Sequence, residues 1–256
     1  ATIDRLTRAQ LVEYQHHNYV APGMVLCAAG NVEHERFVRR VKRYARGLPQ
    51  GQRPCFQPAP KARDGPRVHL HRRVIAQMQM ALGIRTCSRR DRRRFPLRLL
   101  NTVLGENMSS RLFQTLREDL ALAYSVQSSL SLFDDVGALV ISAGLDSDRL
   151  PQALKLIMRE LRRIMDHAPG PTEMRRARDY MIGQIDLGLE STENQMMWLG
   201  EQLLAYGRVI PASNVKRHLS EVTAAQVRDV ARDFCRSERM CLAVVSPLKS
   251  DPGLAR

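Results

Sequence analysis

The histidines and acidic residues are the side chains that could hold a metal ion, and their spacing argues against a zinc site. A zinc-binding helix places two histidines one turn apart beside a glutamate, as H-E-x-x-H or as the inverted H-x-x-E-H. The only Glu-His step is Glu33-His34, where Gly30 stands in place of the first histidine. His34-Glu35 fails too, since Val38 occupies the second histidine position. The chain is therefore expected to bind no metal by itself.

The cysteines form no pattern that would signal a disulfide framework or a zinc ribbon. Their number is odd and no two stand in a C-x-x-C pair: Cys27, Cys55, Cys87, Cys235 and Cys241. P-loop, G-x-S-x-G and G-x-G-x-x-G motifs are absent from the sequence as well. Free thiols favour a reducing compartment, which we expect to be a bacterial cytoplasm, with the periplasm as the alternative.

The elements that would position functional residues begin with a helix, a strand and a helix. Thr7 and Gln10 form a capping box, in which the hydroxyl accepts a first-turn N–H and the amide reaches back, so a helix is expected to start there. Met24–Ala29 is predicted to be a short apolar strand. Apolar residues recur at helical spacing in residues 37–44 and predict a second helix.

A proline-rich stretch divides the chain. Residues 49–66 lose periodicity and hold five prolines, so they are predicted to be a linker. Beyond it we expect extended segments over residues 67–84 and a β-hairpin over 123–133 and 137–144. Helices are expected near 96–104, 109–118, 148–166, 172–189 and 192–205, followed by a helix from Thr223 and a strand from Met240.

The end of the chain repeats its beginning at a constant offset of 216 residues. Residues 6–11 (LTRAQL) align with residues 222–227 (VTAAQV), so the capping box recurs. At the same offset, Met24 and Leu26 meet Met240 and Leu242. We infer an internal duplication in which residue 1 falls near the end of a first copy, most of which is absent from this chain.

Several stretches in a fixed order resemble the C-terminal half of the M16 family of zinc peptidases, which includes pitrilysin, insulinase and the mitochondrial processing peptidase. The most specific is LGENMSSRLF at residues 104–113, followed by LRE at 116–118 and LAYSV at 122–126. Residues 18–32 and 195–208 support the resemblance, which extends from Leu6 to Pro247. The family pairs two homologous domains in each half, in agreement with the repeat.

The resemblance implies an α+β fold of the M16 type (LuxS/MPP-like metallohydrolase), with helices packed on an antiparallel sheet. It also implies an order of domains along the chain. Residues 1–48 would be the tail of a truncated first domain, 49–66 a Pro-rich linker, 67–247 a second domain that binds no zinc, and 248–256 a C-terminal tail.

The function that the resemblance implies is a share in a zinc metallopeptidase. In the family, H-x-x-E-H and a more distant glutamate of the first domain bind the zinc, so this chain is expected to carry no cofactor and to be inactive alone. Zinc is expected in the missing first domain or in a partner subunit. An arginine and a tyrosine of the second domain assist in active relatives, and they match Arg117 and Tyr124. A guanidinium and a phenol can stabilise charge that develops on a peptide carbonyl.

Other interpretations of these residues stay open. Arg117 can pair with Glu118 or Asp119 at a helix end while Tyr124 fills a strand face, and the chain would then be a non-catalytic scaffold or assembly subunit. Alternation near residues 77–83 predicts a half-buried strand. At a sheet edge its Gln77, Gln79 and Ala81 could bind a peptide by strand addition, whereas a plain inner strand needs no such role.

The net charge of +14 is local. Residues 36–98 hold 19 Lys and Arg against two acids, and seven of those arginines lie in residues 85–98. Three interpretations of that segment are open: a solvated face, a surface that binds an acidic partner, or a nucleic-acid-binding site. Because no pattern of interleaved aromatic residues supports the last interpretation, we do not expect the segment to bind nucleic acid. The expected partners are a peptide or unfolded polypeptide substrate and a zinc-bearing upstream half or subunit, in a homo- or heterodimer. No apolar run is long enough to span a membrane.

Overall fold

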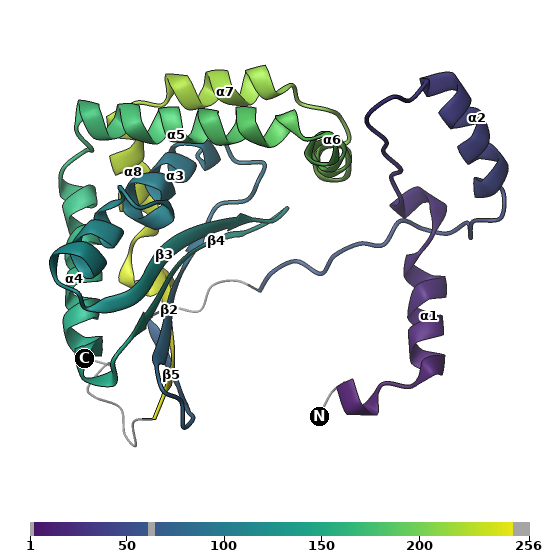
Figure 1. The fold of residues 1–256 in the computed structure, drawn as a ribbon. Coiled ribbons are helices and arrows are strands. Elements are labelled where there is room, and N and C mark those ends of the chain that lie inside the picture. Colours follow the sequence, from purple (N-terminus) through teal and green to yellow (C-terminus); the bar gives the residue numbers. More distant parts are fainter. Residues whose placement is uncertain (1–2, 61–64, 248–256) are drawn as a thin grey trace. The chain divides into compact units, whose positions relative to one another are not determined.

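The computed structural model describes residues 3–60 and 65–247. The expected C-terminal tail at 248–256 and residues 61–64 of the expected linker lie outside this described part. The chain divides into two compact units, both visible in Figure 1. The helical unit consists of Ala1–Pro58 with Asp186–Pro211, and the sheet unit consists of Ala59–Ile185 with Ala212–Arg256.

The sheet unit is built on five strands. They are β1 (Arg67–Arg72), β2 (Met78–Thr86), β3 (Ala123–Leu132), β4 (Gly137–Leu145) and β5 (Met240–Ser246). Their order is β1-β5-β2-β4-β3, so β1 and β3 are the two edges. The predicted hairpin is confirmed as the β3–β4 pair. The predicted antiparallel sheet with helices packed on it is confirmed for the pairs of β2, β3, β4 and β5. The outer strand β1 pairs in parallel with β5, to which the chain returns by a long connection.

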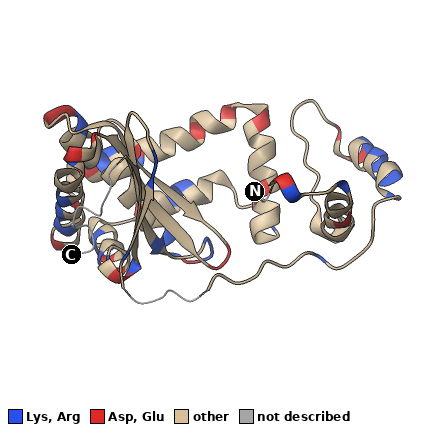
Figure 2. Ribbon diagram, turned by 90° about the horizontal axis from the view of Figure 1, so that it is seen from below, with Lys and Arg blue, Asp and Glu red and all other residues tan. Residues whose placement is uncertain are grey.

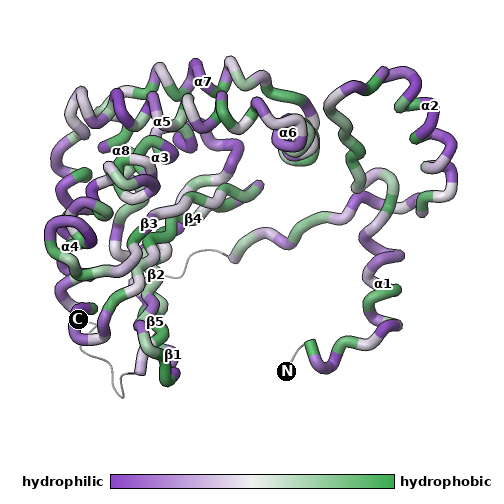
Figure 3. The backbone as a smooth tube through the Cα atoms, viewed as in Figure 1, coloured by the Kyte–Doolittle hydropathy of each residue, from purple (hydrophilic) through white to green (hydrophobic). Residues whose placement is uncertain are grey.

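Helices cover one face of this sheet. Side chains alternate along β2, so that Met78, Met80, Leu82 and Ile84 are buried while the residues between them face the other side. The buried face packs under α3 (Arg94–Asn101), α4 (Leu150–Asp166) and α8 (Ala224–Phe234), as Figure 1 shows. Figure 3 shows apolar positions gathered along the central strands and the helices over them.

The remaining elements of the sheet unit surround this core. They are α5 (Pro171–Glu190), which continues into the helical unit, α7 (Ala212–Glu221), and the short 3₁₀ turns η5 (Ser147–Arg149) and η6 (Ser237–Arg239). The α7 helix, which packs on α3, is an element that the sequence did not predict. The predicted helices over 148–166, 172–189 and the one from Thr223 are confirmed as α4, α5 and α8.

Two π-helical turns occupy the region where ordinary helices were expected. The α3 helix runs directly into η3 (Thr102–Glu106), and η4 spans Phe113–Asp119. Gly105, expected to separate two helices, lies inside η3, where a Cβ would come within 2.8 Å of the Ser128 hydroxyl oxygen. The turn can approach β3 this closely because residue 105 has no side chain. Such π turns are frequent at functional sites.

The helical unit contains α1 (Arg8–Asn18), α2 (His34–Ala45) and α6 (Thr192–Tyr206), with 3₁₀ turns at Ile3–Arg5 (η1) and Ala21–Gly23 (η2). The Thr7–Gln10 capping box is confirmed, because Thr7 N donates to Gln10 Oε1 at 2.9 Å and Gln10 N donates to Thr7 Oγ1 at 3.3 Å. Thr223 and Gln226 form the same box at the start of α8. The repeat is therefore present in local structure as well as in sequence.

The strand predicted at Met24–Ala29 is wrong, because these residues form no strand. Their counterparts at the 216-residue offset belong to β5, which lies between β1 and β2. Leu26 is 64% exposed, whereas Leu242 is 6% exposed. The two segments are similarly apolar, but a strand depends on hydrogen bonds to neighbouring strands, and the described helical unit has none to offer Met24–Ala29.

Candidate functional site

The face of the sheet opposite α3, α4 and α8 carries small and polar side chains. Along one row Gln79 of β2 pairs with Gly144 of β4, which pairs with Ser125 of β3. Along the next row Ala81 pairs with Ser142, which pairs with Gln127. No helix of the sheet unit, in its described residues, packs on this face. We call it the open face; a polar surface on an uncovered sheet suits contact with water or a polar ligand.

A β-bulge at the start of β3 aims two neighbouring side chains at the open side. The pairing with β4 shifts between Ala123 and Ser125, so Tyr124 is an extra residue in the ladder. As a result Tyr124 and Ser125 are both exposed, whereas strict alternation would bury one of them. The bulge therefore determines where the predicted site tyrosine points, and bulges of this kind often occur beside functional sites.

A pocket of about 400 Å³ opens where the open face meets the two π turns. The segment from η3 to η4 forms one wall and strands β2, β3 and β4 form the floor. Its polar lining residues include Gln79, Asn107, Arg117, Ser125, Gln127 and Ser142. The sequence did not single out Asn107, Gln127 or Ser142, although the strand alternation of the predicted hairpin would have put Gln127 and Ser142 on one face.

Arg117 lies in this pocket and is held only loosely by its neighbours. Its guanidinium stacks over the Phe113 ring, with 4.9 Å from Cζ to the ring centroid. Its Nε lies 3.9 Å from Glu118 Oε1, the partner that the structural interpretation named, and about half of the side chain is exposed. A long, exposed ion pair contributes little to stability and leaves the guanidinium able to donate to a ligand.

Tyr124 is exposed on β3, and its hydroxyl lies 3.4 Å from both carboxylate oxygens of Asp146. It does not itself line the pocket, but the next residue, Ser125, does. Arg117 and Tyr124 thus belong to neighbouring parts of one surface, the first on η4 and the second on the bulge. Their assignment to peptide chemistry stays a prediction.

The edge-strand interpretation of Gln77, Gln79 and Ala81 is corrected by the sheet order. Strand β2 pairs with β4 on one side and β5 on the other, so its backbone groups cannot accept an added strand. Gln77 precedes β2, and Gln79 Nε2 donates to Gln77 Oε1 at 3.2 Å. Gln79 still contributes a side chain to the pocket, so side-chain contact with a substrate stays a prediction.

Several arginines of the Arg-rich segment at 85–98 form ion pairs, with Asp91 inside the segment and with Asp134 and Asp233 elsewhere in the chain. Arg93 NH2 contacts Asp91 at 2.7 Å and Arg93 NH1 contacts Asp233 at 3.0 Å. Hydrogen bonds from Arg93 hold the pKa of the Asp91 carboxyl below its usual 3.8. Arg89 Nε lies 3.2 Å from Asp134, and Figure 2 shows blue and red residues interspersed in the sheet unit. This pairing favours a solvated, structural face over a nucleic-acid site.

The described residues contain neither a cluster of metal-binding side chains nor a membrane-spanning helix. In residues 3–60 and 65–247, no three His, Cys, Asp or Glu side chains gather closely enough to hold a metal ion. Glu33 and His34, the only Glu-His step, lie at the start of α2 with a glycine at the remaining ligand position. The residues present therefore do not fit zinc. Within the same described ranges, no helix combines the length and apolar composition that crossing a bilayer requires.

The sequence and fold are similar to those of known proteins. A family model described as the peptidase M16 inactive domain matches residues 5–181. An uncharacterized zinc protease of Streptomyces coelicolor is 35% identical over 254 residues, which are 97% of this chain and 55% of that protein. One from Mycobacterium tuberculosis is 35% identical over 96% of this chain and 57% of its own length. The chain thus spans about half the length of the curated relatives it matches.

Solved structures share the fold at low sequence identity. A protease from Helicobacter pylori superposes with a TM-score of 0.86 at 16% identity, covering 96% of this chain and 60% of that one. A peptidase M16 inactive domain from Pseudomonas fluorescens gives a TM-score of 0.86 at 20% identity, covering 97% of this chain and 59% of that one.

Proposed function

The chain belongs to the peptidase M16 family, and from this premise we propose that it is the C-terminal half of a zinc metallopeptidase. In this role it forms part of the wall of a peptide-binding chamber and supplies Arg117 and Tyr124 to assist hydrolysis. An upstream half or a partner subunit carries H-x-x-E-H and the zinc. The observation that carries the proposal is the uncovered polar face of the sheet, with Arg117 in the pocket at its rim.

Peptide binding suits the composition of the open face. Hydroxyl and amide side chains both donate and accept hydrogen bonds, as the backbone of an extended peptide does. Gly144 and Ala81 keep the surface low between the polar side chains, so a chain can lie against it. An aromatic or aliphatic face would instead suggest a buried contact with a second domain.

The assisting roles of Arg117 and Tyr124 follow from their chemistry. In peptide hydrolysis negative charge grows on the carbonyl oxygen as water adds to the carbon, and hydrogen-bond donors aimed at that oxygen lower the barrier. The guanidinium donates through several N–H groups and the phenol through its O–H. Because about half of the Arg117 side chain and 62% of Tyr124 are exposed, each can meet a substrate brought by the other half.

Two features of the helical unit support our proposal that residues 1–48 are the tail of a truncated first domain. Residues 24–29 carry an apolar sequence without strand partners, and α1 repeats the cap of α8 but buries none of its described residues. In a complete first domain these residues would occupy the places that α8 and β5 hold in the sheet unit. The linker over 49–66 and a second domain at 67–247 complete this proposed arrangement.

A mixing experiment tests the proposal. The chain alone should not cleave a quenched peptide, whereas the chain mixed with an upstream half bearing H-x-x-E-H and zinc should. Arg117→Ala and Tyr124→Phe should each lower kcat of the mixture by about 10²-fold, the cost of losing one donor to a developing oxyanion. Arg217→Ala on α7 is the matched control, since Arg217 is also exposed and loosely paired, at 3.8 Å from Glu221.

The outcomes separate the two candidate roles. Cleavage by the chain alone would contradict the assignment of the zinc to another half. If the mixture still cleaves at the same rate with Arg117→Ala and with Tyr124→Phe, these residues do not assist hydrolysis. The chain would then be a scaffold or assembly subunit, a role that the loose Arg117–Glu118 contact also permits. If the mixture does not cleave the peptide, the proposal that the chain is the C-terminal half of a zinc metallopeptidase is refuted.

A further inference from the structure

We propose that the pocket between the π turns and the open face is a subsite for a carboxamide side chain, asparagine or glutamine, of a bound peptide. This deepens the proposed function and rests on it for the identity of the ligand as a peptide. The pocket is lined by residues of the sheet unit alone, so its ligand preference can be tested without catalysis.

The first observation is a set of polar groups whose hydrogen-bonding capacity is unused. Within the described part of the chain, the side chains of Ser125, Gln127 and Ser142 have no hydrogen-bond partner, and all three line the pocket. Gln79 uses only its amide N–H, toward Gln77, which leaves its carbonyl oxygen available. The pocket therefore offers hydroxyl and amide groups that act both as donors and as acceptors. A carboxamide presents the same two functions in return.

The second observation is the space above Gly144, beside the pocket. A Cβ at this residue would lie 3.0 Å from Ser125 Oγ and 3.1 Å from Gln79 Nε2. Side chains of the two flanking strands thus lean toward one another over a position that carries no side chain of its own. Because Gly144 has no Cβ, the side chains of Ser125 and Gln79 can approach each other above it. The methyl group of an alanine at this position would contact both of them closely.

The third observation is the balance of charge. One cation, Arg117, and one anion, Glu106, line the pocket. The Glu106 carboxylate accepts from Thr102 Oγ1 at 2.5 Å, and Arg117 stacks on Phe113. A charged ligand would meet one attractive and one repulsive group, whereas a neutral carboxamide can bond to both. The volume of about 400 Å³ lies at the low end of the range of about 300–1,000 Å³ for ligand pockets, which suits one or two side chains.

Side-chain amide signals of the chain in solution give the test. The chain is titrated with three extended peptides that differ only at one central position, which holds glutamine, glutamate or leucine. The glutamine peptide should shift the side-chain NH₂ resonances of Gln79, Gln127 and Asn107 and bind about tenfold more tightly than the leucine peptide, the difference that one or two added hydrogen bonds make. The glutamate peptide should rank below glutamine.

Variants show whether the pocket itself makes the distinction. Gln127→Leu, Ser142→Ala and Gly144→Ala should each reduce the preference for glutamine over leucine to about twofold or less. Ser129→Ala is the matched control, because Ser129 lies on the same face of the same strand, opposite Val140, outside the pocket. It should retain the preference.

The results distinguish this inference from the proposed function. Equal binding of all three peptides, or a preference for glutamate, overturns the carboxamide subsite even if the two-part mixture cleaves peptides. If the glutamine peptide selectively shifts the side-chain amide resonances but the two-part mixture does not cleave peptides, the carboxamide subsite is supported and the proposed peptidase function is refuted. If Gly144→Ala does not fold, the Gln127→Leu and Ser142→Ala variants carry the same comparison.

Discussion

Arg111, which lies between the two π turns, forms a largely buried ion pair with Glu173 of α5. Its Nε and NH2 groups each donate to one carboxylate oxygen of Glu173 at 2.7 Å, and the arginine side chain is only 14% exposed. Buried Glu160 on α4 adds a second negative charge nearby, and the hydrogen bonds with Glu173 raise the pKa of the guanidinium further. The sequence does not indicate this ion pair, because the two partners lie 62 positions apart.

We predict that Arg111→Met destabilises the sheet unit by about 3–5 kcal/mol, since it leaves the Glu173 carboxylate without its partner. Urea unfolding followed by circular dichroism measures the change. The control is Arg117→Met, which removes an exposed arginine and should change stability by no more than about 0.5 kcal/mol. Adding Glu173→Met to the Arg111 variant should recover part of the loss; a double variant less stable than the single one would contradict the explanation.

Two cysteines are expected to be unreactive in the folded chain. Burial raises the pKa of Cys235 to about 12 and, with help from Asp91, that of Cys87 to about 11. At pH 8 both groups are therefore thiols, while labelling requires the thiolate. Cys55 is exposed. Mass spectrometry after brief iodoacetamide treatment should find Cys55 modified and Cys87 and Cys235 modified only in urea. Rapid native labelling of Cys235 would contradict the packing of α8, and Cys55→Ser should remove the fastest adduct.

At the scale of elements, local signals were predictable from the sequence and long-range ones were not. The capping boxes and the β3–β4 hairpin depend on residues a few positions apart, so the sequence predicts them. The π turns, the bulge at Tyr124 and the failure of Met24–Ala29 to form a strand depend on which segments pack against them. The pocket combines residues from β2, β3, β4 and the π turns. The sequence named two of its lining residues as site candidates, Arg117 through the family resemblance and Gln79 through the alternation of its strand, but it did not indicate that they line one pocket.

The 216-residue offset supplies a matched pair of substitutions that tests this dependence on neighbours. Leu242→Ala should destabilise the sheet unit by about 2–5 kcal/mol, because it empties a buried site on β5. Leu26→Ala, at the equivalent position, should change stability by no more than about 0.5 kcal/mol in this chain. Thermal unfolding of both variants measures the contrast. A large cost for Leu26→Ala here would show that residues 24–29 are already packed.

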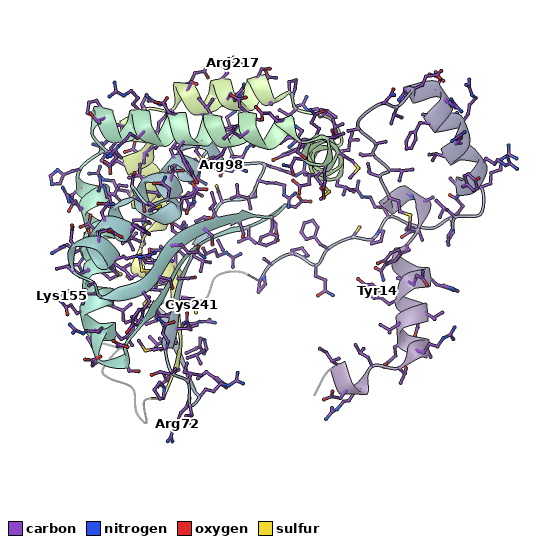
Figure 4. All side chains as sticks on the ribbon, in the orientation of Figure 1. Tyr14, Arg72, Arg98, Lys155, Arg217 and Cys241 are labelled. Carbon is purple, nitrogen blue, oxygen red and sulfur yellow. The ribbon has the colours of Figure 1, made fainter. Side chains whose placement is uncertain are left out.

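At the scale of the whole molecule, the charge of +14 predicts a weak and salt-dependent attraction to polyanions. Several arginines of residues 85–98 are engaged with acids or carbonyl groups; Arg85 NH1, for example, donates to Pro60 O at 2.7 Å. Others, such as Arg72 and Arg217, project into solvent (Figure 4). Fluorescence anisotropy with labelled duplex DNA should give a dissociation constant no tighter than about 10⁻⁶ M at physiological salt, the range of non-specific binding. Nanomolar, sequence-dependent binding would contradict this.

The positively charged residues of strand β1 affect how the chain could associate with copies of itself. It is an edge of the sheet, and four of its six residues are arginine or histidine: Arg67, His69, His71 and Arg72. An uncovered edge invites pairing with the same edge of another molecule, and like charges placed along it oppose such growth. In an antiparallel pair of β1 strands, arginines would face arginines. The positive charge along this edge therefore opposes self-association of the chain through β1.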